Sequence, residues 1–266
     1  MGAVLGGALA ATLATSVAAQ PEEVIEVVTE DTRSEPGEAR LEGEEIRRLP
    51  GALGDPFRAI DALPGVTPTV SGLPFFFVRG APPGNVGYFL DGVSMPLLFH
   101  ALGGPAIVHP AIVDEVAVHR GAYPARFGRY AGGVVSATTT EPDPTWGAQA
   151  SLRLLDVGGL VTGGFADGRG TVLVGGRYSY TGAIFSAISP DLRLDYRDVQ
   201  ARVTFDVSDD ERVSLLLLGS YDFYALTEAE VERPVFATEI YRADTRYQAR
   251  LEGGGRLEVG VTAGFD

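Results

Sequence analysis

The strongest constraint on the fold is an alternation of apolar and polar side chains that begins after Trp146 and continues through residue 266. In one segment the two kinds interleave without a break: Val199, Gln200, Ala201, Arg202, Val203, Thr204, Phe205 and Asp206. The pattern recurs over residues 213–223, 241–251 and 256–265. Because successive side chains of a strand point to opposite faces, it predicts about seven or eight antiparallel strands, each with one apolar and one charged face.

Two architectures use such strands. In a membrane barrel the apolar face meets lipid and the charged face lines a wet lumen, whereas in a soluble sandwich the apolar face packs inward. Successive arginines on the charged faces favour the lumen. Aromatic residues near the predicted strand ends would suit the girdles of a membrane barrel: Tyr178, Tyr180, Tyr196, Tyr221, Phe223, Tyr241 and Phe265. The periodicity alone leaves both architectures open.

Composition removes several classes of function. All 21 basic residues are arginine, so the chain has no lysine for Schiff-base or P-loop chemistry. It also has no cysteine, which excludes thiol catalysis, thiolate metal sites and disulfides. The net charge of −14 opposes binding to nucleic acid. The 35 glycines, clustered with turn residues, favour many short strands over long helices.

The amino terminus predicts export. Residues 4–17 form an apolar run that ends in small residues before Gln20, as in a signal peptide over residues 1–19 cleaved after Ala19. No positive charge precedes the run, and a buried helix is the alternative interpretation. No later stretch of about 20 apolar residues predicts a helical membrane span.

An acidic arm over residues 20–40 follows the predicted cleavage point. It contains one β-prone segment: Val24, Ile25, Glu26, Val27, Val28 and Thr29. An isolated strand of this kind has unpaired backbone groups, so it can add to the edge of another protein's sheet. The alternatives are a first strand of the domain that follows and a plain linker.

Residues 41–141 predict a globular domain of mixed structure. Apolar positions 41, 46 and 49 suggest a short helix ended by Pro50, and a second helix spans 55–63 with Asp55 as its N-cap. Short buried strands are predicted at 75–78, 88–90 and 116–118. Between two of them, Asp91 and Gly92 predict a tight turn with positive φ.

No catalytic or metal site is predicted in this domain. His100, His109 and His119 do not have the spacing of a zinc site. Ser94 lacks the glycines of a nucleophile elbow. The apolar segment at 73–77 suits core packing, with a ligand pocket as the alternative. We therefore expect no metal, no cofactor and no enzymatic activity.

The order of several motifs is similar to the plug motifs of TonB-dependent outer-membrane receptors. These are Pro64-Gly-Val66, Phe77-Val-Arg-Gly80, Tyr88-Phe-Leu-Asp-Gly-Val93, Val113-Asp-Glu-Val-Ala-Val-His-Arg-Gly121 and the segment from Arg120 to Val135. The resemblance covers about residues 44–136 and departs from the commoner pattern at Phe127-Gly128. It implies a β-rich chain in which an α+β plug domain at 41–141 precedes the antiparallel strands of an incomplete transmembrane β-barrel at 146–266.

The resemblance also implies roles for particular residues. The segment at 24–29 resembles the TonB box, which the energy-transducing protein pulls. Plug motifs and plug-to-barrel contacts fall on Arg79, Gly80, Asp91, Gly92, Arg120, Gly121, Gly128, Gly132 and Gly133. Arg79 and Arg120 are expected to form ionic contacts with the barrel wall, and the glycines to permit close approach to it. Loops at 81–84 and 100–104 are the expected region of ligand contact.

The implied function is energised uptake of a scarce ligand such as an iron chelate, cobalamin, a saccharide or a peptide. The implied location is the outer membrane of a Gram-negative cell, with plug and arm facing the periplasm. The implied partners are a TonB-type energy-transducing protein, outer-membrane lipid and a small imported ligand.

The number of predicted strands is small for such a transporter. Plugged transporters use about 22 strands, so we expect this sequence to be the front part of a longer receptor. One alternative is an outer-membrane binding or structural protein that keeps the plug without transport. The other is a secreted soluble enzyme built on a β-sandwich.

Overall fold

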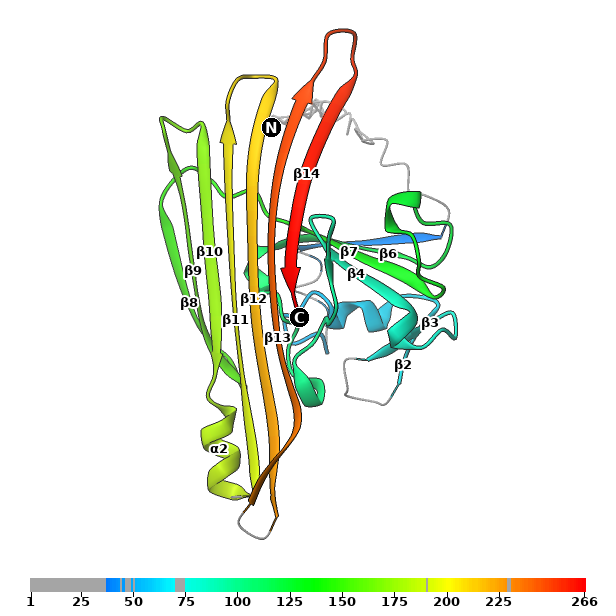
Figure 1. Ribbon diagram of the computed structural model, residues 1–266, viewed down its shortest axis with the longest axis vertical. Coiled ribbons are helices and arrows are strands. Elements are labelled where there is room, and N and C mark those ends of the chain that lie inside the picture. Colours follow the sequence, from blue (N-terminus) through cyan, green and yellow to red (C-terminus); the bar gives the residue numbers. More distant parts are fainter. Residues whose placement is uncertain are drawn as a thin grey trace, which may run out of the picture. The chain divides into compact units, whose positions relative to one another are not determined.

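The computed structural model describes residues 37–43, 45, 49, 51–69, 75–189, 191–228 and 231–266 (Figure 1). The predicted signal peptide and the β-prone segment at 24–29 lie outside these residues. The described part contains a seven-stranded sheet, a five-stranded sheet and a two-stranded sheet. No helix within it is long and apolar enough to cross a membrane.

The seven-stranded sheet confirms the strands predicted beyond Trp146. Its strands pair antiparallel in sequence order, and an eight-residue helix, α2 (Thr181–Ile188), lies between the third and fourth. The strands are β8 (Gly147–Leu152), β9 (Asp156–Phe165), β10 (Gly170–Ser179), β11 (Leu192–Asp206), β12 (Glu211–Glu228), β13 (Val231–Arg250) and β14 (Arg256–Phe265). In the described residues β8 and β14 are the two edges, so this sheet is not closed.

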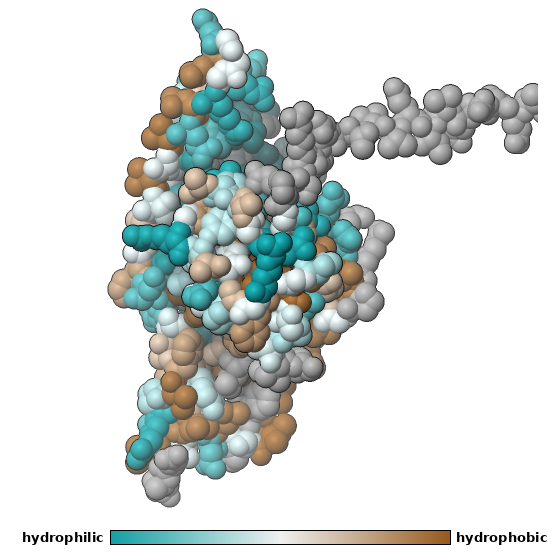
Figure 2. Space-filling view, turned by 90° about the vertical axis from the view of Figure 1, so that its right-hand side faces the viewer, coloured by the Kyte–Doolittle hydropathy of each residue, from teal (hydrophilic) through white to brown (hydrophobic). Residues whose placement is uncertain are grey.

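The two faces of this sheet differ in polarity as the alternation predicted. On β11, Gln200 is 1% exposed and Asp198 is 5% exposed, whereas Val199 on the opposite face is 52% exposed. We call the face of Asp198 the inner face and the face of Val199 the outer face. Figure 2 shows apolar side chains gathered along the left margin of the molecule. The polar face is therefore covered and the apolar face is open.

The five-stranded sheet forms the centre of the preceding domain, in the order β1-β6-β7-β4-β5. Only β4 and β7 pair in parallel. The strands are β1 (Glu38–Glu42), β4 (Val86–Leu90), β5 (Val93–Met95), β6 (Val113–His119) and β7 (Gly133–Thr139). Between β1 and β4 in the sequence, β2 (Val66–Pro68) and β3 (Phe76–Val78) form a separate antiparallel pair. Strands predicted at 75–78, 88–90 and 116–118 are confirmed as β3, β4 and β6.

Short 3₁₀ helices join these strands. They are η1 (Arg58–Ala62), η2 (Pro83–Asn85), η3 (Ala101–Gly103), η4 (Pro110–Ile112) and η5 (Ala125–Phe127). The turn predicted between β4 and β5 is confirmed, because Asp91 has a φ of 48° and Gly92 a φ of 79°. Such left-handed values at both central residues suit a two-residue hairpin.

The helix predicted from Leu41 is wrong at its start. Residues 38–42 form β1, which pairs with the edge of β6 so that Leu41 lies opposite Val116. Three residues assigned to the arm, 38–40, therefore lie in the sheet. Leu41 is 5% exposed, and an apolar residue between charged ones fits a strand as well as a helix. Pairing with the open edge of β6 satisfies the backbone groups of residues 38–42 and therefore favours the strand over the helix.

The second predicted helix is shorter than expected. Only η1 forms, and Asp55 caps the turn before it, since its Oδ1 accepts a hydrogen bond from the Phe57 backbone N–H at 3.0 Å. The other carboxylate oxygen accepts from the Ala106 N–H at 2.7 Å. Asp55 thus joins two loops distant in sequence, which holds the segment in a tight turn.

One apolar cluster joins the domain to the inner face of the seven-stranded sheet. The domain contributes fully buried side chains such as Phe57, Ile60, Leu90 and Ile107. The sheet contributes a strip of inward apolar side chains to the same cluster: Leu160, Leu173, Leu216, Leu218 and Ile240. Burial of such side chains stabilises by about 1.5–3 kcal/mol each, so the inner face holds the domain by apolar packing as well as by polar contacts.

Candidate functional site

A small loop of the domain carries a histidine to the inner face of the sheet. The His100 N–H donates to Pro105 O at 3.0 Å, and the Gly104 N–H donates to His100 O at 3.1 Å. Gly103 has a φ of 77°, and a Cβ on Gly104 would lie 2.8 Å from the Cβ of His100. The glycines therefore let the chain close tightly enough to present the imidazole to β11 and β12.

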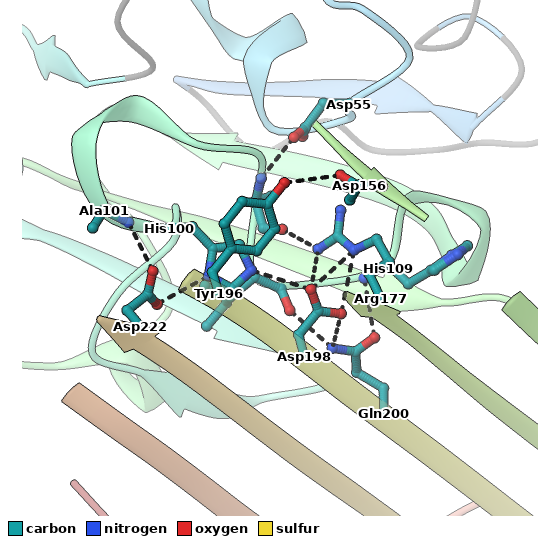
Figure 3. Close-up of polar contacts among 12 residues, drawn as sticks. Asp55, His100, Ala101, His109, Asp156, Arg177, Tyr196, Asp198, Gln200 and Asp222 are labelled. Carbon is teal, nitrogen blue, oxygen red and sulfur yellow. Dashed lines mark hydrogen bonds and ion pairs between the residues drawn. The ribbon is translucent and has the colours of Figure 1, made fainter. Parts of the chain in front are cut away.

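His100 lies between two carboxylates of the sheet (Figure 3). Its Nδ1 is 2.9 Å from Asp222 Oδ2, and its Nε2 is 3.1 Å from Asp198 Oδ2. The ring of Tyr196 stacks on the imidazole at a centroid distance of 4.3 Å. The side chains of His100, Asp198 and Asp222 are fully buried. Ionised carboxylates only accept hydrogen bonds, so two such partners require both ring nitrogens to carry a proton.

The electrostatics of His100 agree with this geometry. Burial alone would lower its pKa, but the hydrogen bonds and charges of Asp198 and Asp222 outweigh burial and raise the pKa above its ordinary value. The same Asp222 also accepts from the Ala101 N–H through Oδ1 at 2.9 Å. His100 is therefore a buried imidazolium that bridges two strands of the sheet.

Arg177 and Gln200 of the sheet bind the loop that follows His100. Arg177 pairs with Asp198, with 2.8 Å between Nη2 and Oδ2, and donates to the carbonyl of Ala106. Gln200 donates from Nε2 to the Ile107 carbonyl at 2.8 Å. These contacts satisfy backbone carbonyls in the connection between β5 and β6.

A second histidine nearby is in the opposite charge state. The His109 N–H donates to Gln200 Oε1 at 3.1 Å, and His109 Nδ1 accepts from the Ala111 N–H at 3.2 Å. Burial, with a contribution from the charge of Arg177, lowers the pKa of His109 to about 4. The interface therefore holds one charged and one neutral histidine at neutral pH.

The β4–β5 turn makes a separate contact with the sheet. Asp91 accepts from the Thr139 N–H at 2.9 Å and from its hydroxyl at 2.6 Å, and Arg202 Nε lies 3.9 Å from the same carboxylate. Arg202 also donates to the Thr140 carbonyl at 3.0 Å. A Cβ on Gly92 would lie 3.2 Å from Arg246 Nη1 of β13. Asp91 and Gly92 thus lie at the contact between domain and sheet.

In the part of the chain that the structure describes, the contacts found for Arg79 and Arg120 lie within the domain, and their predicted ionic contacts with the wall stay a prediction. Arg120 donates to the carbonyls of Gly37 and Pro64, both within the domain. Arg79 follows β3 with a φ of 49°, and its guanidinium lies beside Gly121. Arg120 therefore reaches backbone carbonyls of its own domain, and Arg79 lies beside the residue that follows Arg120. Gly80 lies in the same turn, also with positive φ.

Three other motif glycines, Gly128, Gly132 and Gly133, have their near neighbours within the domain. A Cβ on Gly132 would lie 2.5 Å from the Cβ of Ala81, and one on Gly133 would lie 2.7 Å from His119 O. A Cβ on Gly128 would make an ordinary 3.6 Å contact with Ala125 O. Close approach is therefore real at two of these positions, but it occurs between loops and strands of the domain.

Tyr196 corrects the predicted aromatic girdle. It is 2% exposed on the inner face, where its hydroxyl donates to Asp156 Oδ2 at 3.2 Å. Its position has the same parity as Asp198 and Gln200, which the alternation already placed on the polar face. Tyr178, by contrast, is 53% exposed on the outer face. Parity along β11 was the signal that should have excluded Tyr196 from the girdle.

The remaining interface residues had weaker signals. Asp198, Asp222 and Arg177 are charged residues on predicted strands, and nothing near them in sequence marks a partner. Their partner His100 is 98 and 122 positions away from the two aspartates. In the residues that the structure describes, no group of three or more His, Cys, Asp or Glu side chains is arranged to hold a metal ion.

Comparisons with known proteins agree with this architecture. Residues 34–135 match the TonB-dependent Receptor Plug Domain. The comparison with curated proteins gives no match. Among solved structures, the outer membrane transporter YddB from Escherichia coli is similar with a TM-score of 0.61 at 16% identity, over 85% of this chain and 38% of that one.

Two further structures have the same fold. The siderophore receptor PirA from Pseudomonas aeruginosa is similar with a TM-score of 0.53 at 19% identity, over 86% of this chain and 50% of that chain. The alcaligin outer membrane receptor FauA from Bordetella pertussis gives 0.56 at 16% identity, over 85% and 38%. The chain therefore spans half or less of the length of each of these proteins.

The domain and sheet define a class: a plug followed by a partial wall of antiparallel strands. The chain contains the plug domain of a TonB-dependent receptor, and the strands that follow have the fold of the barrel of such outer-membrane receptors. We refer below to residues 37–141 as the plug and to the seven-stranded sheet as the wall.

Proposed function

We propose that this chain supplies the plug and part of the wall of an outer-membrane receptor that imports a scarce ligand with energy delivered by a TonB-type protein. The observation that carries the proposal is the polarity of the wall. Its inner face carries buried charged and polar side chains beside a strip of apolar ones and is covered by a plug, and its outer face is apolar and open. This arrangement suits a bilayer outside and a filled lumen inside.

The wall also has a proposed direction in the membrane. The turns at 166–169, 207–210 and 251–255 lie at one end, and the longest connection between neighbouring strands, residues 180–191 with α2, lies at the other. Outer-membrane barrels have short turns on the periplasmic side. We therefore assign the α2 end to the cell exterior.

The plug contacts suggest how transport would proceed. A ligand captured at the outer end near loops 81–84 and 100–104 would be followed by strand pairing between TonB and residues 24–29. Pulling on the plug must then separate His100 from Asp198 and Asp222. A buried imidazolium pulled from its carboxylates can exchange them for water in the lumen, so these polar contacts can open and re-form.

The ligand class we favour is an iron chelate. PirA is named as a siderophore receptor and FauA as an alcaligin receptor. Cobalamin, a saccharide or a peptide are the other classes that the proposal admits. Uptake by cells expressing the protein from its own gene, measured with radio-iron loaded hydroxamate and catecholate siderophores and with labelled cobalamin, separates these classes.

The absence of cysteine allows a direct test of the TonB contact. A single cysteine at position 25, Ile25→Cys, should form a disulfide with a cysteine placed in the sheet edge of TonB. The matched control is Asp209→Cys in the exposed turn between β11 and β12, which faces the same compartment in the proposed orientation.

Two results distinguish a transporter from an outer-membrane binding protein that does not transport. Cross-linking at position 25 above the control, together with loss of uptake in Ile25→Pro, supports the transporter. Equal cross-linking at both positions, or unchanged uptake in Ile25→Pro, removes the arm from the mechanism. Protein found in the outer membrane without any TonB contact would then be a binding protein that retains the plug.

A further inference from the structure

The loop that presents His100 is bound from both sides. From the plug, Arg58 of η1 donates through Nη2 to the carbonyl of Gly103 at 2.6 Å. From the wall, the carboxylates of β11 and β12 hold the imidazole between them (Figure 3). The loop therefore connects the two parts of the molecule, and His100 is the one titratable side chain in residues 100–104.

The geometry at His100 requires a particular protonation of the ring. Its two nitrogens lie 2.9 Å and 3.1 Å from oxygens of two different carboxylates. Each carboxylate also has another donor, the Ala101 N–H for Asp222 and the Arg177 guanidinium for Asp198. An ionised carboxylate cannot donate, so both contacts are hydrogen bonds only while the imidazole carries two protons. Loss of one proton would leave two acceptors facing each other in a fully buried site.

Other charged and titratable groups surround this contact on the elements packed against it. Besides the two aspartates, they are Asp156 of β9, Arg177 of β10, Tyr196 of β11, Asp55 and Arg58 at η1, and His109 in the connection to β6.

These neighbours do not account for a change of charge between pH 6 and pH 9. Ordinary aspartate, arginine and tyrosine side chains keep one charge state over this range. His109 is neutral there, because burial and the charge of Arg177 lower its pKa to about 4. At His100 burial alone would lower the pKa, but the two carboxylates outweigh it and raise the pKa above the ordinary value. Among the described residues of this contact, the group that loses its charge as the pH rises is therefore His100.

We propose that His100 is a pH-sensitive latch between the plug and the wall. The latch is closed while the imidazole is charged, and it opens when a rise in pH removes one of its two protons. One carboxylate then loses a hydrogen-bond donor while it stays buried, and a buried charge without a partner is unfavourable. Separation of the loop from the wall lets water reach that carboxylate, so alkaline pH favours release of the plug.

The latch would set how easily the plug moves when it is pulled. In this respect the inference rests on the proposed function, because only a receptor pulled by a TonB-type protein uses such a release. The contact itself does not depend on transport. It can be measured in outer-membrane vesicles without TonB and without an imported ligand, so failure of the latch and failure of the proposed function give separate results.

Thiol labelling of one buried position measures the separation of plug and wall. The chain has no cysteine, so Ala106→Cys places a single thiol where the backbone accepts from Arg177 and the side chain is fully buried. Asp209→Cys in an exposed turn, labelled in parallel at each pH, corrects for the ionisation of the thiol itself. The readout is the ratio of the two labelling rates from pH 6 to pH 9, in vesicles from cells that express the gene.

We expect the ratio to rise about tenfold from pH 6 to pH 9, because one hydrogen bond to a charged group is lost. His100→Gln should remove the rise, since an amide does not titrate in this range. His109→Gln, the matched control at the neutral histidine of the same interface, should keep it. Asp222→Asn should move the midpoint of the rise to lower pH by about one unit or more, because it removes a negative charge that favours the imidazolium.

A purely structural role for His100 predicts a different pattern, in which each variant changes the level of labelling but not its dependence on pH. A flat ratio with the latch residues intact overturns the latch. The same rise in His100→Gln also overturns it, as does a midpoint unmoved by Asp222→Asn in vesicles where Asp209→Cys labels at its normal rate. Absence of energised uptake in cells whose latch behaves as expected would count against the proposed function alone.

Discussion

The two faces of the wall are opposite in chemistry although they come from the same strands. On the inner face of β11, Asp198 and Gln200 are nearly inaccessible, and each has partners in the plug. On the outer face Val199, between them in sequence, is half exposed. A water-soluble protein has the reverse arrangement. The difference teaches that the plug completes the inner face and that a nonaqueous medium must complete the outer one.

The two faces also contribute to the free energy of folding in different ways. Inner charges are costly to bury, and only their mutual pairing with His100 and Arg177 makes burial tolerable. The outer side chains have no partner and depend on the surrounding medium. A substitution on the inner face should therefore lower the free energy of unfolding by leaving a buried charge unpaired. The cost of a substitution on the outer face should depend on its depth in the bilayer.

The largest effect is expected on the inner face. Asp198→Ala removes the carboxylate shared by His100 and Arg177, which leaves the buried Arg177 without its ion-pair partner and His100 with Asp222 alone. The free energy of unfolding should fall by about 3–5 kcal/mol. Denaturant unfolding in lipid vesicles, followed by the fluorescence of the single tryptophan, measures it.

The control for this substitution is Asp209→Ala in an exposed turn, which should change the free energy of unfolding by less than about 0.5 kcal/mol. A loss in Asp198→Ala as small as that of the control would mean that the ionic contacts do not hold the plug to the wall.

The next effect is expected on the outer face. Val161, 44% exposed on β9, lies four residues and about 13 Å along the strand from Val157, near the α2 end of the wall. Val161→Arg should therefore cost about 2–4 kcal/mol in a bilayer, whereas Val207→Arg at the turn after β11 should cost about 0–1 kcal/mol. Unfolding from vesicles compares the two. Equal costs at both depths would argue for a water-facing sheet.

The smallest effect is the pH dependence of the two histidines. The folded pKa of His100 is raised, so its stabilisation is full below about pH 6.5 and is lost as the pH rises through the folded value. The folded pKa of His109 is lowered to about 4. Its stabilisation is therefore full above the ordinary histidine pKa of about 6.5 and is lost as the pH falls from there toward 4. Together they give maximal stability near pH 6.5, with slopes of at most about 1.4 kcal/mol per pH unit and proton.

Two variants separate these slopes. His100→Gln should remove the decline at alkaline pH, and His109→Gln should remove the decline at acid pH, in unfolding measured from pH 4 to pH 9. If each variant kept the wild-type profile, other groups would control the pH dependence.

Sequence reasoning succeeded where neighbouring residues decide the structure. The alternation through 199–206 fixed both the strand and the side of each residue, because the period of a strand is a local property. The turn at Asp91 and Gly92 was predicted for the same reason. The order of plug motifs located the domain that the family comparison confirms.

Sequence reasoning failed where two segments far apart compete for the same residue. Leu41 fits a helix and a strand equally, and only the open edge of β6 selects the strand. Arg120 donates to the carbonyls of Gly37 and Pro64, and no local pattern predicted these two contacts. Tyr196 was assigned to a girdle by residue type, although its parity placed it inward.

The sequence by itself determined the alternating strands, the hairpin turns and the order of plug motifs, since these depend on φ/ψ preferences and side-chain period over a few residues. The tertiary structure alone decided that His100 lies between Asp198 and Asp222 and that Arg177 binds the loop beside it. Such contacts depend on how the plug is placed against the wall, and the free energy of pairing buried charges carries no local pattern along the chain.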